Sequence, residues 1–121
     1  MDHSCNSIIV TCIDFRFQEY INTWVANNFQ PKTFDRVALA GGVFDLEYIL
    51  KQIEISNRLH HIKKVILINH EDCGAYGESG THEKHIMDLE NAKSKIEESL
   101  ISLKIETYYL HLDGTFEKVS G

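Results

Sequence analysis

The sequence predicts an α/β protein with a mostly parallel central sheet, flanked by helices and ending in an antiparallel hairpin at the carboxyl-terminal edge. Short runs of β-branched residues alternate with longer segments in which apolar residues recur every three or four positions. A strong turn signal, Asp113-Gly114, separates the last two strand-like runs. The order βαβαβαββ is typical of an open sheet built through right-handed crossovers.

The first half of the chain contains two strands and two helices in this interpretation. Residues 7–13 form an apolar, β-branched run with polar neighbours, which favours a buried strand. Residues 17–29 have the apolar spacing of an amphipathic helix. Residues 36–40 are a second strand, and residues 46–60 are a second helix that Asp45 is well placed to cap.

The second half repeats the alternation and then changes direction. Residues 65–69 are continuously apolar until Asn69, as expected of a parallel strand that helices cover on both faces. A third amphipathic helix is indicated over residues 86–100, with charged residues on its outer side. Residues 107–112 form the fourth strand, and residues 115–119 are expected to return antiparallel to it.

Composition limits the class of protein. A chain of 121 residues with one proline predicts a single domain over residues 1–121. Twelve basic and eighteen acidic residues give a formal charge of −6 without a basic cluster, so nucleic acid is not an expected partner. No leader pattern and no run of ~20 apolar residues is found, so we expect a cytoplasmic protein that does not bind membranes.

Residues able to perform chemistry follow two of the predicted strands. Cys12, Asp14 and Arg16 lie at the end of the first strand, and His70 and Cys73 follow the third. Parallel strands bring their carboxyl ends to one edge of the sheet, where ligands bind if the strand order reverses. In a reducing compartment, cysteines favour a metal or catalytic role over a disulfide.

The sequence therefore predicts a zinc site whose ligands are Cys12, His70 and Cys73. The spacing of His70 and Cys73 suggests that both lie on one side of a helical turn. Three protein ligands leave one tetrahedral position for water, whose pKa zinc lowers from ~15.7 to ~7. The alternative is that both thiols are small core residues and that His70 is a hydrogen-bonded loop histidine.

Three motifs resemble those of the β-class carbonic anhydrases and occur in the same order. They are Cys-Ile-Asp-Phe-Arg at residues 12–16, Ala-Gly-Gly at residues 40–42 and His-Glu-Asp-Cys-Gly at residues 70–74. The resemblance implies one zinc per chain, held by Cys12, His70 and Cys73, and reversible hydration of carbon dioxide to bicarbonate by a zinc-bound hydroxide. It also implies a homodimer or a dimer-based oligomer.

The same resemblance implies that Asp14 and Arg16 form a hydrogen-bonded catalytic pair beside the metal. An ionised Asp14 would accept the hydrogen of the hydroxide and orient it toward carbon dioxide. Alternatively, Asp14 is the fourth zinc ligand in a closed state that opens when Arg16 captures the carboxylate. The chain departs from the family pattern at Gly42, where Asn is usual, and at Phe15, where Ser is common.

Two further functions remain open at this point. The scaffold would also suit a zinc hydrolase of carbonyl sulfide or carbon disulfide, or a non-catalytic zinc or thiol module. A dinucleotide-binding fold is disfavoured, because no Gly-x-Gly-x-x-Gly turn follows the first strand.

Other side chains near the motifs are weaker candidates. Exposure near helix ends is expected for four histidines, which makes them candidate proton shuttles: His60, His61, His82 and His85. Four aromatic residues are candidates for an apolar wall around the substrate, or for core or dimer contacts: Phe15, Phe44, Tyr48 and Tyr76.

Overall fold

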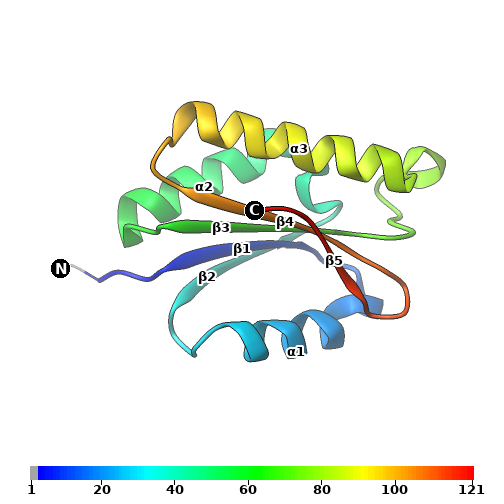
Figure 1. Ribbon diagram of the computed structural model, residues 1–121, viewed down its shortest axis with the longest axis horizontal. Helices are drawn as coiled ribbons and strands as arrows, with labels where there is room; N and C mark the ends of the chain where they lie inside the picture. Colours follow the sequence, from blue (N-terminus) through cyan, green and yellow to red (C-terminus); the bar gives the residue numbers. More distant parts are fainter. Residues whose placement is uncertain (1–2) are drawn as a thin grey trace.

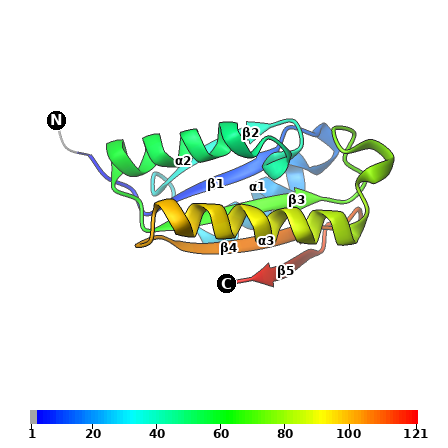
Figure 2. The same ribbon diagram turned by 90° about the horizontal axis from the view of Figure 1, so that it is seen from above.

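A computed structural model describes residues 3–121 and has a five-stranded sheet at its centre (Figures 1 and 2). The strand order is β2-β1-β3-β4-β5. The first four strands are parallel, and the last pairs antiparallel with its neighbour. The strands are β1 (Ser7–Cys12), β2 (Phe34–Leu39), β3 (Lys64–His70), β4 (Lys104–Leu110) and β5 (Phe116–Ser120).

Helices cover both faces of the sheet. Figure 1 shows α2 and α3 together on one face and α1 on the other. The helices are α1 (Gln18–Asn28), α2 (Leu46–His60) and α3 (His82–Ser99). Short 3-10 turns follow three of the strands: η1 (Phe15–Phe17) after β1, η2 (Gly42–Phe44) after β2 and η3 (Gly77–Ser79) after β3. These turns lie at the edge of the sheet where the site residues were expected.

The two central strands are buried because each face packs against helices. All six residues of β1 are buried. Ile8 and Val10 belong to the core beneath α2 and α3, whereas Ile9 belongs to the core beneath α1. In β3, Leu67 and Ile66 divide between the same two cores. This alternation is the period of two expected of a strand, with both faces apolar because both are covered.

The predicted fold class is confirmed, including the antiparallel hairpin at the edge. The bounds of β4 differ at both ends, because it spans Lys104–Leu110 rather than residues 107–112. Because β4 begins with a polar residue, the apolar pattern of the sequence does not reveal that Lys104 pairs with Lys64 of β3. After Leu110 the chain turns, and the N–H of Gly114 donates to the carbonyl of His111 at 2.9 Å.

Within residues 3–121, none of the helices combines the length and the apolar character needed to cross a bilayer.

Candidate metal site

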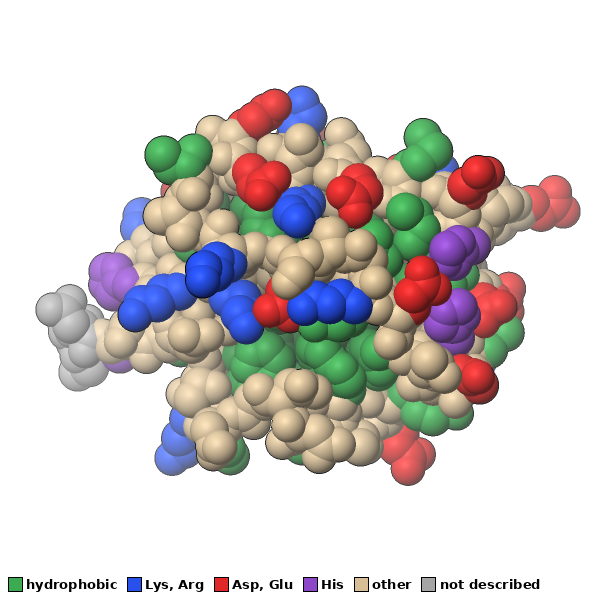
Figure 3. All heavy atoms as spheres, in the orientation of Figure 1, with side chains coloured by type: hydrophobic (Ala, Val, Ile, Leu, Met, Phe, Trp, Pro, Cys, Tyr) green, Lys and Arg blue, Asp and Glu red, His purple; other side chains and the backbone are tan. Residues whose placement is uncertain are grey.

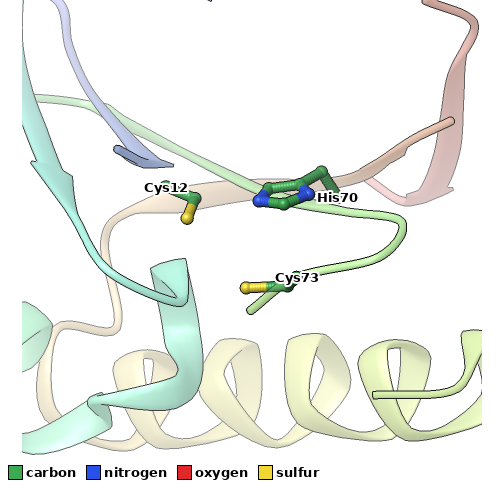
Figure 4. Close-up of side chains that lie close together, drawn as sticks. All are labelled: Cys12, His70 and Cys73. Atoms are coloured by element: carbon green, nitrogen blue, oxygen red, sulfur yellow. The ribbon is translucent and has the colours of Figure 1, made fainter. Parts of the chain in front are cut away.

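The site lies where the strand order reverses, because β1 and β3 are neighbours although α1, β2 and α2 separate them in the chain. Cys12 is the last residue of β1, and His70 is the last residue of β3. Figure 4 shows the two thiols and the imidazole directed toward a common point. One ligand atom from each of Cys12, His70 and Cys73 lies within 4.8 Å of the others, and all three residues are buried.

The orientation of His70 leaves one ring nitrogen available. Its Nδ1 lies 2.8 Å from the carbonyl oxygen of Glu71, so this nitrogen carries the proton and donates it. Its Nε2 is buried and has no hydrogen-bond partner among the described residues. The ring of Phe17 packs against the imidazole with centroids 4.1 Å apart and fixes its plane. A ligating histidine typically has this arrangement, in which one nitrogen binds a carbonyl and the other faces the metal.

The two thiols are strongly coupled. The contact with Cys73 lowers the pKa of Cys12, and the neighbouring His70 imidazole and the N–H of Gly41 lower it further. The same contact with Cys12, together with burial, raises the pKa of Cys73. Their interaction therefore favours the thiolate at Cys12 and the protonated thiol at Cys73. Two sulfur atoms and one imidazole nitrogen form a donor set that zinc prefers.

The segment that carries Cys73 differs from the expected helical turn. Asp72 has a φ of 57°, which is left-handed and interrupts any helix between His70 and Cys73. The N–H of Glu71 still donates to the carbonyl of Leu110, at 2.9 Å, so the strand pairing continues one residue past His70. The left-handed residue then reverses the chain and brings Cys73 back toward β1. The prediction that the i, i+3 spacing reflects a helix was therefore wrong.

Asp14 and Arg16 form a close ion pair beside the cluster. Nη2 of Arg16 lies 2.7 Å from Oδ2 of Asp14, and its Nε lies 3.1 Å from Oδ1. Arg16 is held in turn by Asp72, through the side-chain Oδ2 at 3.0 Å and the backbone carbonyl at 2.8 Å. Hydrogen bonding from Arg16 lowers the pKa of Asp14 to about 2, so the carboxylate is ionised at neutral pH. Oδ2 of Asp14 lies 3.9 Å from Nε2 of His70.

Sequence reasoning missed Asn69, which occupies the space next to Gly42. Its Oδ1 accepts a hydrogen bond from the N–H of Val43 at 3.1 Å. A Cβ added at Gly42 would lie 2.5 Å from that same oxygen, and Gly42 has a φ of +58°. The glycine thus makes room for the Asn69 amide and adopts a conformation that other residues rarely use. The signal in the sequence was a polar Asn at the end of an apolar strand.

Asn69 also anchors a buried polar network under α3. Its Nδ2 lies 2.9 Å from Nδ1 of His85 and 3.1 Å from the hydroxyl of Tyr76. The Tyr76 hydroxyl donates to Asp88 at 2.8 Å. His85 is fully buried, so the expectation that it is exposed was wrong. The cause is the earlier start of α3, which places His85 on the helix face that packs against the sheet.

The remaining candidate residues lie closer to the surface. His61 and His82 are exposed, and His60 is partly exposed. His82 and His111 both contact the carboxylate of Glu117, and Figure 3 shows histidines beside acidic side chains on this face. Among the aromatic residues, Tyr76 is buried beside Cys12 and Cys73, whereas three are exposed: Phe15, Phe44 and Tyr48.

Comparison with known proteins assigns the family. A family model described as "Putative carbonic anhydrase" matches residues 2–120. The chain belongs to this family. An uncharacterized protein of Rickettsia conorii is 28% identical to this carbonic anhydrase family member, over 97% of this chain and 73% of that protein.

Solved structures confirm the fold of this family member. A carbonic anhydrase from Glaciozyma antarctica superimposes with a TM-score of 0.72 at 19% identity, covering 99% of this chain and 85% of that one. The apo form of a carbon disulfide hydrolase superimposes with a TM-score of 0.57 at 15% identity, covering 93% of this chain and 77% of that one. At these identities the likeness concerns the fold.

Proposed function

We propose that Cys12, His70 and Cys73 hold one zinc ion and that the protein catalyses the reversible hydration of carbon dioxide to bicarbonate. The observation that carries this proposal is the buried, unpartnered Nε2 of His70, which faces two thiols. A buried polar atom without a partner costs about 1–3 kcal/mol, and a metal ion at this point removes that cost. Family membership supplies the reaction.

In this proposal each side chain has a separate task. A zinc ion held by Cys12, His70 and Cys73 would supply an activated water molecule as the nucleophile toward carbon dioxide. The ionised Asp14 accepts a hydrogen bond from the attacking group and so directs its lone pair toward the substrate. Arg16 holds the Asp14 carboxylate through two of its nitrogens. Asp72 holds Arg16 in the orientation that this task requires.

The Asp14–Arg16 ion pair also bears on whether the site is open, with a position free for water, or closed by Asp14. The 3.9 Å between the Asp14 carboxylate and Nε2 of His70 is short enough for a rotated Asp14 to become the fourth ligand. In the structure, Arg16 binds this carboxylate. We therefore propose that the ion pair keeps the fourth position free for water, and that loss of Arg16 closes the site.

The decisive experiment combines zinc analysis with a stopped-flow assay of carbon dioxide hydration. Cys73→Ser is expected to lose one zinc equivalent and all hydration. Asp14→Asn is expected to keep its zinc and to lose about 10²-fold in kcat/KM, because the amide is a poorer proton acceptor. The matched control is Asp113→Asn in the exposed β4–β5 turn, which is expected to retain both. Zinc-loaded parent without hydration would refute the proposal.

A second candidate is hydrolysis of carbonyl sulfide or carbon disulfide at the same site. The structural likeness to a carbon disulfide hydrolase supports it. Parallel assays of zinc-loaded protein on carbon dioxide and on both sulfur compounds separate the two functions. A higher kcat/KM for a sulfur compound would replace carbon dioxide as the substrate. Bound zinc with turnover of neither substrate class would indicate the non-catalytic module.

We further propose that this carbonic anhydrase family member works as a cytoplasmic homodimer or dimer-based oligomer. A reducing compartment keeps Cys12 and Cys73 available as metal ligands instead of a disulfide. The exposed aromatic residues near the site provide apolar surface for a second copy: Phe15, Phe44 and Tyr48.

A further inference from the structure

A second group of metal-ligating side chains lies at the opposite end of the sheet. One ligand atom from each of Cys5, Asp35 and His60 lies within 4.8 Å of the others, and all three residues are partly buried. Figure 1 shows the start of β1 and the last turn of α2 at this end, away from the ends of β1 and β3 that carry Cys12 and His70. The two groups therefore share no residue and occupy separate places.

The three residues are held together by contacts that do not involve a metal. The N–H of Cys5 donates to the carbonyl of His60 at 3.0 Å, which joins the segment before β1 to the end of α2. Asp35 is placed by the pairing of β2 with β1, where it lies opposite Ile8. The hydroxyl of Ser56 donates to Oδ2 of Asp35 at 2.7 Å. A carboxylate held by a neighbouring hydroxyl is typical of the outer shell of a metal site.

The donor chemistry suits zinc. A thiolate, an imidazole and a carboxylate are all common zinc ligands, and tetrahedral bonds of ~2.0–2.3 Å place the ligand atoms ~3.5 Å apart. Nδ1 of His60 already lies 2.6 Å from Oδ2 of Asp35. This pair alone is an ordinary hydrogen bond between a helix end and a strand, but the thiol of Cys5 beside it has no part in that bond. The thiol instead lies 3.6 Å from the carbonyl oxygen of Ser7, and a zinc ion would join it to the His60–Asp35 pair in one site.

A further imidazole lies close by, although His3 is not among the residues whose ligand atoms lie within 4.8 Å of one another. The ring of His3 lies with its centroid 4.9 Å from that of His60. We propose that Cys5, Asp35 and His60 bind a second zinc ion and that His3 becomes the fourth ligand when its side chain turns toward them. Four protein ligands close the coordination sphere, so this zinc has a structural role. It fastens the segment before β1 to β2 and α2.

The first test measures zinc content after equilibration with excess zinc and removal of the unbound metal. Cys5→Ser and His60→Gln are each expected to hold one zinc equivalent less than the parent. The control is His61→Asn, because His61 is exposed, adjoins His60 and has a left-handed φ of 54° that Asn tolerates. Circular dichroism establishes that each variant is folded. A Cys5→Ser protein that holds as much zinc as the parent would overturn the proposal.

The second test isolates this site from the first. In Cys73→Ser, added zinc is expected to raise the thermal midpoint, since a ligand that binds only the folded state stabilises it. In the double variant Cys5→Ser/Cys73→Ser, the shift is expected to disappear. A shift that persists in the double variant would contradict the second site. Loss of zinc from Cys5→Ser but not from Cys73→Ser would instead refute the proposed catalytic site, so the two failures are distinguishable.

Discussion

The surroundings of Cys12 depend on two adjacent glycines, Gly41 and Gly42. The N–H of Gly41 donates to Sγ of Cys12 at 3.3 Å, and the next residue, Gly42, accommodates the amide of Asn69. The Asn69 amide binds the backbone of Val43 directly. An Asn at position 42 would compete with Asn69 for the same space. Gly42 therefore leaves this space to the side chain of Asn69.

The role of Gly42 can be tested by substitution. Gly42→Ala is expected to lower the free energy of unfolding by about 1–3 kcal/mol, because it combines a left-handed backbone with a close approach to Asn69. Gly74→Ala is the matched control, since a Cβ there meets nothing within 4 Å and its φ is negative or extended. The control is expected to change stability by less than about 0.5 kcal/mol. Urea unfolding of the metal-free proteins measures both, and equal effects would contradict this assignment.

His85 makes stability depend on pH. Burial lowers the pKa of His85 to about 4 from its ordinary value of 6.5. The unfolded chain therefore binds a proton that the folded chain rejects between these values. This stabilisation is fully present above pH 6.5 and is lost as the pH falls from 6.5 through about 4. Its magnitude is on the order of 1–3 kcal/mol.

A variant that cannot take up the proton tests this linkage. His85→Gln is expected to show a smaller loss of unfolding free energy between pH 7 and pH 4 than the parent, both in the metal-free form. His61→Asn, which changes an exposed histidine, is expected to behave like the parent. Parallel pH profiles for the parent and His85→Gln would show that His85 does not carry this dependence.

Among the helices, α3 matters most for the surroundings of the site, because it carries His85, which contacts Asn69 of β3, and Asp88, which contacts Tyr76. Its start is fixed by Thr81, whose side-chain oxygen accepts a hydrogen bond from the N–H of Lys84 at 3.1 Å. This cap lies in the exposed segment between η3 and the helix. It starts α3 at His82, four positions before the apolar periodicity becomes visible at Ile86.

Removal of this cap is expected to weaken the helix without touching the site. Thr81→Ala should lower the free energy of unfolding by about 1 kcal/mol, because an N-terminal N–H loses its acceptor. Thr81→Ser keeps the hydroxyl and should lie close to the parent. Chemical denaturation followed by circular dichroism gives both values. A Thr81→Ser protein as unstable as Thr81→Ala would assign the effect to the lost methyl group instead.

Across the whole molecule, an apolar side chain is exposed at the edge of the candidate site, whereas the outer surface of α3 is charged. Phe15 is 86% exposed in the turn that follows β1. Ile101 is similarly exposed, at 88%, but lies in the turn between α3 and β4. The loop of Phe15 directly adjoins Asp14 and Arg16 of the candidate site. A second copy that covers Phe15 would therefore also border the site.

Phe15 and Ile101 provide a matched test of the proposed dimer. Phe15→Asp is expected to weaken self-association by at least about tenfold, since a charge would be buried in an apolar contact. The control is Ile101→Asp, because the Ile101 side chain is similarly exposed. This substitution is expected to leave the association unchanged. Sedimentation equilibrium over a range of concentrations measures both constants. A monomeric parent, or equal effects of the two substitutions, would contradict an interface at Phe15.

The sequence by itself determined the fold class, the order of elements and the candidate ligands. Continuous apolar runs identify β1 and β3 because both faces of these strands are buried, and the reactive residues stand out at the strand ends. It could not determine exact boundaries, as β4 shows, because a polar strand start is indistinguishable from a loop until its pairing partner is known.

Only the tertiary structure decided how residues that are far apart in the chain share space. Three contacts join segments from different elements: the packing of Asn69 against Gly42, the burial of His85 beside Asn69, and the approach of Cys5 to His60. Periodicity reports which face of an element is apolar, but it does not report what lies opposite. The meeting of Cys12, His70 and Cys73 was predictable because parallel strands have a general rule for where their ends meet, whereas no such rule exists for these other side-chain contacts.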